Sequence, residues 1–181
     1  MSSQPAECLP SVIDVVAEFR STLEARAHRR ASAVMELLLD LHDNNLAQWN
    51  REDSVRSDGA DDAAVAAAKR DIDALNTRRH QLVEAIDAAV DAAIIQTASA
   101  TPATESPASV FDRLSILVTR IYFTERAANS PRPDRDAYAA RLPVLHRQLA
   151  MLQAALEALL DEVREGRKRF VPHQSFKLYE S

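Results

Sequence analysis

The stretch LPVLHRQLAMLQAALEALLDEV, residues 142–163, decides the fold class. Its large apolar residues recur every three or four positions, a spacing that places them on one face of an α-helix. A long helix with one apolar stripe buries that stripe against other helices, so the pattern predicts an antiparallel helix bundle. Pro143 predicts either a kink or the true helix start, with 135–142 as a separate turn. The stripe comprises Leu142, Leu145, Leu149, Leu152, Leu156, Leu159 and Val163.

The composition agrees with an all-α fold. Of 181 residues, only two are glycine, whereas 46% are hydrophobic and 27% are charged. A β-sandwich or a dinucleotide-binding α/β fold needs more glycines for its turns and phosphate loops. The length allows one domain with a sizeable core. We therefore expect a single all-α domain, an antiparallel bundle of about five helices.

The chain divides into helical segments separated by turn signals. Residues 1–10 predict a flexible N-terminus, 11–166 the helix bundle, and 167–181 a tail that docks on the bundle through its aromatic residues Phe170, Phe176 and Tyr179. Serines at helix starts, a Ser-Asp-Gly turn and Gly166 after the last helix set the boundaries. The expected helices start at Ser11 and then cover 33–56, 60–97, 107–128 and 135–165, with a loop at 98–107.

The segment 33–56 carries polar residues at helical spacing on one face. The face begins with Leu38 and continues with His42, Asn45, Trp49, Glu52 and Arg56. One interpretation is a helix end at which the tryptophan packs and the polar groups reach solvent. The other is a pocket wall with an aromatic floor and a carboxylate beside a guanidinium.

The segment 60–97 places a charge in its apolar stripe, which comprises Val65, Ala68, Ile72, Leu75, Leu82, Ile86 and Ala93. Arg79 lies between Leu75 and Leu82, and a buried guanidinium is costly unless it is paired. It either meets a carboxylate from another helix or lines a cavity and meets a ligand anion. A polar strip flanks the stripe: Lys69, Asp73, Asn76, His80 and Asp87.

The segment 107–128 carries two arginines one heptad apart. Arg113 and Arg120 share a face with Ser109 and Ile116, and Asp112 is adjacent. Two guanidinium groups near a capped helix start suit a carboxylate or a phosphate. A pair of salt bridges between helices is the alternative.

Three blocks in these segments resemble the bacterial family called domain of unknown function 4254. They read NLAQWNREDSVR at 45–56, KRDIDALNTRRHQLVEAID at 69–87 and TESPASVFDRLSILVTRIY at 104–122, and FKLY at 176–179 also fits. The resemblance implies no activity. The residues it assigns to the family pattern are Trp49, Glu52, Asp53, Arg56, Lys69, Asp73, Asn76, Arg79, Glu105, Asp112 and Arg113.

The chain also departs from that pattern. His80 and Gln81 replace the family's usual polar pair after the arginine, and Ala108 stands where a glycine is usual. Arg120, with Thr119 before it, stands where a lysine is usual, and Phe123 stands where a histidine is usual.

These patterns lead us to expect a protein that binds, or binds and transforms, a small anionic metabolite bearing phosphate or carboxylate, of the nucleotide- or sugar-linked kind. Glu52, Asp53 and Arg79 are the catalytic candidates. The alternative is a helical adaptor or homodimer whose polar network is structural. The binding candidates are His42, Asn45, Trp49, Arg56, Lys69, Asp73, Asn76, His80, Asp112, Arg113 and Arg120.

The remaining expectations concern cofactors, partners and location. We expect no cofactor and no dedicated metal site, although the Glu52–Asp53 pair leaves magnesium open. The net charge of −5 argues against nucleic acid as a partner. Because we see neither a signal peptide nor a long apolar run, we expect no membrane contact and a cytoplasmic location.

Overall fold

The computed structural model describes residues 9–24, 32–55 and 62–174. Over these residues the chain is an all-α bundle, as predicted, with one very small two-stranded sheet. Five long helices and one short one form it: α1 (Val12–Leu23), α2 (Ala33–Val55), α3 (Asp62–Ala93), α4 (Pro107–Ala128), α5 (Arg135–Ala139) and α6 (Leu142–Arg164). The strands β1 (Thr101–Pro102) and β2 (Lys168–Arg169) pair in parallel.

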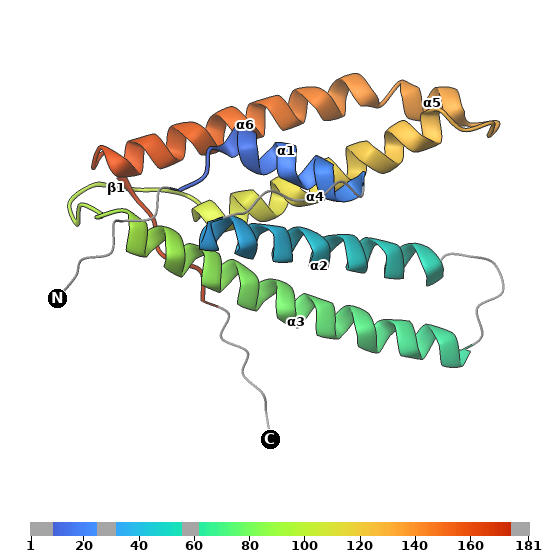
Figure 1. The fold of residues 1–181 in the computed structure, drawn as a ribbon, viewed down its shortest axis with the longest axis horizontal. Helices are drawn as coiled ribbons and strands as arrows, with labels where there is room; N and C mark the ends of the chain where they lie inside the picture. The colour runs from blue at the N-terminus through green and yellow to red at the C-terminus, as the bar shows by residue number, and fades with distance from the viewer. Residues whose placement is uncertain (1–8, 25–31, 56–61, 175–181) are drawn as a thin grey trace.

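Helix α4 is the centre of the bundle and packs against each of the other five helices. Figure 1 shows α2 and α3 side by side as a hairpin below α4, with α6 above it and α1 between. This central position explains why α4 buries residues on several sides. Phe111, Leu114, Val118 and Ile121 are each at most 2% exposed.

The predicted helix starts are confirmed by their capping contacts. The Ser11 hydroxyl accepts a hydrogen bond from the Asp14 backbone N–H at 3.1 Å. The Ser106 hydroxyl accepts one from the Ser109 N–H at 3.4 Å, and Pro107 is the first residue of α4. Each serine thereby satisfies an N–H group that has no partner inside its helix.

The stretch around Pro143 forms two helices instead of one kinked helix. Pro143 is the second residue of α6, where its missing N–H costs nothing. Of the two alternatives left open by the sequence, the separate turn is therefore correct, and it is α5. At the other end, Gly166 adopts φ 71°, and the Arg167 N–H donates to the Glu162 carbonyl at 2.8 Å. These are the contacts of a glycine-terminated helix.

The apolar stripe expected on α3 departs from the structure at its first residue, whereas Ala68 is buried at 3% exposure and Ile72 and Leu75 are partly buried. Val65 is 41% exposed, and the α3 residues in the main core cluster all come from Leu82 onward. Val83 and Val90, which the expected stripe omitted, are buried, because this half of α3 packs against α4 as well as α2. The helix also ends at Ala93, before the predicted Thr97.

The segment 98–107 was expected to be a loop, but it contains β1. The Thr101 N–H donates to the Arg167 carbonyl at 3.1 Å, and the Ala103 N–H donates to the Arg169 carbonyl at 2.7 Å. The segment after α6 is thus held against the bundle, and Phe170 is 4% exposed. Expectations that involve residues 1–8, the Ser57–Gly59 turn, Arg56, Phe176 and Tyr179 lie outside the described residues.

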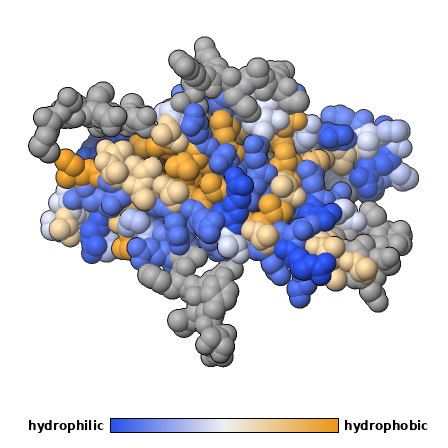
Figure 2. All heavy atoms as spheres, turned by 60° about the horizontal axis from the view of Figure 1, so that its bottom comes forward, coloured by the Kyte–Doolittle hydropathy of each residue, from blue (hydrophilic) through white to orange (hydrophobic). Residues whose placement is uncertain are grey.

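The surface seen in Figure 2 mixes hydrophobic and hydrophilic residues, with the broadest hydrophobic area toward the end at which β1 lies. In the described part of the chain, no helix combines the length and the apolar character that crossing a membrane requires.

Candidate functional site

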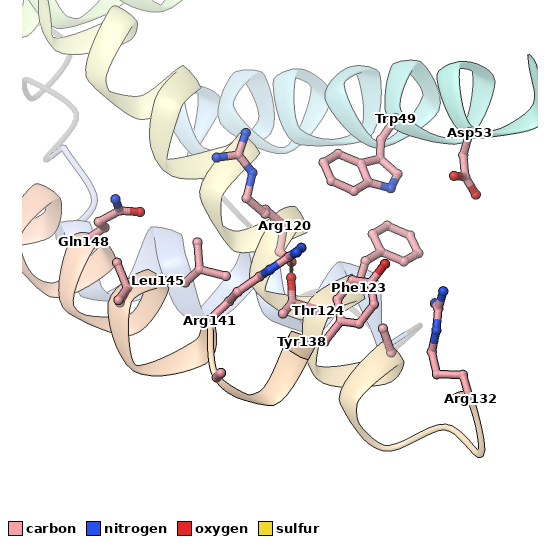
Figure 3. A pocket seen from close by; sticks show the side chains of 13 residues that line it. Trp49, Asp53, Arg120, Phe123, Thr124, Arg132, Tyr138, Arg141, Leu145 and Gln148 are labelled. Carbon is pink, nitrogen blue, oxygen red and sulfur yellow. Dashed lines mark hydrogen bonds between the residues drawn. The ribbon is translucent and has the colours of Figure 1, made fainter. Parts of the chain in front are cut away.

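A pocket of about 780 Å³ lies where α2, the second half of α4, α5 and the start of α6 meet. Figure 3 shows Trp49 and Asp53 reaching it from α2, with Arg120, Phe123 and Thr124 on α4. Its lining is rich in aromatic rings and guanidinium groups. The remaining lining residues are Ala127, Arg132, Tyr138, Ala140, Arg141, Val144, Leu145 and Gln148.

Aromatic rings form one wall of the pocket. The Trp49 and Phe123 rings are stacked, with centroids 5.5 Å apart and planes 2° apart. The Tyr122 ring meets the edge of Phe123 at 5.3 Å. This packing joins α2 to α4 and holds the indole in place beside the pocket.

Three arginines line the pocket, and they differ in their partners. Arg132 forms an ion pair with Asp134, whereas Arg120 and Arg141 form none with the described residues. The guanidinium carbons of Arg132 and Arg141 lie 4.7 Å and 5.1 Å from the ring centroid of Tyr138. The charges of Arg120 and Arg141 are therefore not neutralised by an ion pair with a described residue, although the charge of Arg141 also helps to lower the pKa of Asp134.

The Arg132–Asp134 pair alters the acidity of both groups. Because the guanidinium of Arg132 donates hydrogen bonds to it, the pKa of the Asp134 carboxyl is held below its usual value. The same hydrogen bonding raises the pKa of Arg132. The positive charge of Arg132 is thus already neutralised by Asp134. Figure 3 also shows the side chains of Arg132 and Asp53 directed toward each other from opposite sides of the pocket.

A separate polar network lies inside the bundle between α2, α3 and α4. The Asn45 amide donates to Asp112 Oδ1 at 2.9 Å and to Ser115 Oγ at 3.0 Å. His42 Nδ1 lies 2.9 Å from Ser115 Oγ, and its ring stacks on Phe19 at 4.4 Å. Arg79 completes the network through two hydrogen bonds to the Asp112 carboxylate.

The contact between Arg79 and Asp112 answers the question raised by the charge in the α3 stripe. Arg79 meets a carboxylate from another helix, and hydrogen bonding to Asp112 raises its pKa. The negative charge of Glu52 acts in the same direction, and Glu52 itself accepts a hydrogen bond from Gln48 at 3.0 Å. Arg79 and Glu52 lie outside the lining of the pocket.

The structure places the candidate residues in several locations instead of around one cavity. Of the residues proposed from the sequence, Trp49, Asp53 and Arg120 line the pocket. His42, Asn45, Asp112 and Arg79 form the internal network. Lys69, Asp73 and His80 are exposed, and Asn76 is partly buried outside the pocket. Arg113 forms an ion pair with Glu105 at 2.7 Å. Arg56 lies outside the described residues.

Several lining residues were missed by the sequence reasoning. Phe123 was noted only as a departure from a family pattern, and Arg132, Tyr138 and Arg141 belong to a stretch interpreted as a break and a helix start. The one available signal was the density of arginine in and around α5, together with Tyr138 inside it. It is weak, because exposed arginines are common in any helical protein.

No three His, Cys, Asp or Glu side chains come together in a metal-binding group anywhere in 9–24, 32–55 or 62–174. The carboxylate that lines the pocket, Asp53, comes from the Glu52–Asp53 pair considered for magnesium.

The fold and the pocket define the protein as a helix bundle with a central helix and an arginine- and aromatic-lined pocket at one end.

A family model described as "Protein of unknown function (DUF4254)" matches residues 35–171. The chain belongs to this family, as its three sequence blocks indicated. No curated protein and no solved structure was found to match it.

Proposed function

We propose that this protein binds a small anionic metabolite in the pocket between α2, α4, α5 and α6. The observation that carries the proposal is that two arginines of the pocket have no ion-pair partner among the described residues. Arg120 and Arg141 both line the pocket, and neither forms an ion pair with a described residue. A guanidinium presents several donors in a plane that matches a carboxylate or a phosphate.

The shape and lining of the pocket support a ligand that contains a ring. A volume of about 780 Å³ is within the range of small-molecule sites. The stacked Trp49–Phe123 wall offers an apolar surface on which a base or a sugar ring can lie. A nucleotide or a nucleotide sugar combines such a ring with the anionic group that Arg120 and Arg141 would hold.

Asp53 is the residue best placed to act on such a ligand. Its exposed carboxylate lines the pocket together with Arg132 and Arg141, which flank α5, and it can accept a hydrogen bond there from a hydroxyl or amine of the ligand. A general base needs this reach before anything else. Arg79, by contrast, is committed to Asp112, so its role in the proposal is to hold α3 against α4.

The test uses Trp49, the single tryptophan of the chain, as a reporter. Nucleotides, nucleotide sugars, sugar phosphates and small diacids are titrated with and without magnesium while its fluorescence is recorded. We expect saturable change with one class, and at least tenfold weaker binding in Arg120→Gln and Arg141→Gln, since a charge-assisted hydrogen bond is worth about 1.5–3 kcal/mol.

Arg70→Gln is the matched control, because Arg70 is exposed on α3 and lies outside the pocket. Equal weakening in all three variants would show that net charge matters and the pocket does not. A flat response from the folded wild-type protein would contradict the proposal. It would favour the adaptor or homodimer alternative, for which α6 offers the exposed Val144 and Met151, 51% and 69% exposed, and light scattering would then give the oligomeric state.

A further inference from the structure

An apolar groove continues directly from the pocket along the surface between α4 and α6. It has a volume of about 640 Å³, and its floor consists of Ile116, Leu117, Met151, Leu152 and Ala155. Arg120 and Gln148 line both the groove and the pocket, so the two spaces meet at these side chains.

We propose that the ligand of this protein is an amphiphile: besides the group bound in the pocket it carries a single aliphatic chain, with its anionic group held by Arg120 and Arg141 and the chain lying in the α4–α6 groove. The inference rests on the proposed function, because it places the same anionic group at the same arginines. It adds the substrate class: an alkyl or acyl compound with a phosphate or carboxylate at one end.

The charges at the two ends of the groove determine which way the ligand lies. Arg113 stands at the end far from the pocket, and its guanidinium pairs with Glu105 at 2.7 Å. Arg120 stands at the near end and has no ion pair with a described residue. An anion is therefore attracted to the Arg120 end, and the neutral chain extends toward the Arg113–Glu105 pair.

The distance between these arginines sets the length of chain that fits. Arg120 lies seven positions after Arg113, which corresponds to about 10 Å along α4. An extended chain advances about 3.5 Å over three bonds, so about eight carbons span the groove. A chain of this length would cover apolar surface that water now reaches, including Met151, which is 69% exposed.

The first experiment is a calorimetric titration with alkyl phosphates of two, four, six, eight, ten and twelve carbons, kept below micelle-forming concentrations. Burial of each methylene in the groove should tighten binding about threefold to fourfold. We expect the gain to continue to about eight carbons and then to stop. Arg120→Gln should weaken every member of the series by the same factor.

Ala155→Trp blocks the distal half of the groove while leaving the pocket intact, because Ala155 is an exposed groove residue remote from the pocket lining. In this variant we expect the gain to stop at shorter chains. Ala150→Trp is the matched control: it introduces the same indole at another exposed alanine of α6 that lies outside the groove, and it should bind the series as the wild type does.

The outcomes separate this inference from the proposed function. If nucleotides or short phosphates bind through Arg120 and chain length has no effect, the amphiphile is excluded and the pocket proposal stands. If chain length matters equally in Ala155→Trp and the wild type, the chain lies elsewhere and the inference fails. A further outcome is that the protein sediments with anionic phospholipid vesicles in an Arg120-dependent way but does not bind the dissolved alkyl phosphates. The groove would then contact a lipid bilayer, and the proposal of a dissolved ligand would be overturned. Binding of neither nucleotides nor alkyl phosphates contradicts both proposals.

Discussion

Arg79 on α3 and Asp112 on α4 form a two-point ion pair inside the bundle. The Arg79 Nε donates to Asp112 Oδ1 at 2.8 Å, and Nη2 donates to Oδ2. The side chains are 28% and 10% exposed, so both charges are largely withdrawn from water. Asn45 donates a further hydrogen bond to the same carboxylate at 2.9 Å, so the pair joins three helices at one point.

Replacing Arg79 by methionine should lower the free energy of unfolding by about 2 kcal/mol. The variant leaves the Asp112 carboxylate with Asn45 but without its positive partner, and an uncompensated buried charge is costly. Urea denaturation followed by circular dichroism measures the change. In a double-mutant cycle with Asp112→Asn we expect a coupling free energy of about 1–3 kcal/mol, because the two side chains are in direct contact.

Arg78→Met serves as the control for this pair. Arg78 comes no closer to Asp40 than 3.6 Å, and both side chains are more than half exposed. Such surface pairs contribute little to the free energy of unfolding. Its loss should change stability by less than about 0.5 kcal/mol. A stable Arg79→Met protein that no longer binds ligand would contradict the structural role and return Arg79 to the binding site.

Asp87 on α3 should be needed to hold the start of α4 and the segment after β2 against this helix. Its side chain is fully buried, and its two carboxylate oxygens accept from the backbone N–H groups of Ala108 at 2.9 Å and His173 at 2.8 Å. Asp87→Asn places an amide N–H against one of these donors, so we expect a loss of about 2 kcal/mol.

Hydrogen exchange distinguishes this local effect from a general one. In Asp87→Asn the Ala108 and His173 amides should exchange faster than the amides of the α2–α3 hairpin. Asp91→Asn is the control, since Asp91 is exposed and, among the residues that the structure describes, its side chain bonds only to Gln96. Uniform acceleration throughout the protein would show that Asp87 has no special part in fixing these segments.

The carboxyl of Asp134 should titrate below its ordinary pKa of about 4. Hydrogen bonds from Arg132 favour its charged form in the folded protein, which lowers the pKa. The stabilisation is therefore present above the unfolded-state pKa and is lost as the pH falls through the lower folded-state pKa. Carboxyl carbon NMR measures the midpoint.

In Arg132→Gln the Asp134 midpoint should move up toward the ordinary value, whereas Arg70→Gln should leave it unchanged. Because Asp134 is exposed at the surface, we expect the overall unfolding free energy to respond only slightly. Identical midpoints in the wild type and Arg132→Gln would exclude Arg132 as the cause of the shift.

Gly166→Ala should destabilise the protein by about 1–2 kcal/mol, because φ 71° is costly for an L side chain. A Cβ at this position would also lie 2.6 Å from Thr97 Oγ1. In a Thr97→Ala background the contact is removed and only the backbone cost remains, so the substitution should be less harmful there. Thermal unfolding measures the destabilisation. If Gly166→Ala destabilises both backgrounds equally, the Thr97 side chain can move away from the new Cβ without a loss of stability.

The sequence by itself determined the helices and most of their limits. Serine caps, Pro107 and Gly166 act through backbone groups within one or two turns, so their effect is local and can be read without a fold. The leucine period of 142–163 likewise predicted three of the four buried residues of α6, Leu149, Leu156 and Val163, but not Leu160. The identity of the family followed from three contiguous blocks, which need no tertiary information.

Tertiary structure decided which polar residues meet. Arg79 and Asp112 lie 33 positions apart, and Trp49 and Phe123 lie on different helices, so no helical period relates them. The pocket depends on the angle at which α5 and α6 return beside α4, which brings Arg132, Tyr138 and Arg141 opposite α2. Helical period places a side chain on a face of its own helix, but only the packing of helices determines whether that face meets a partner, a cavity or water.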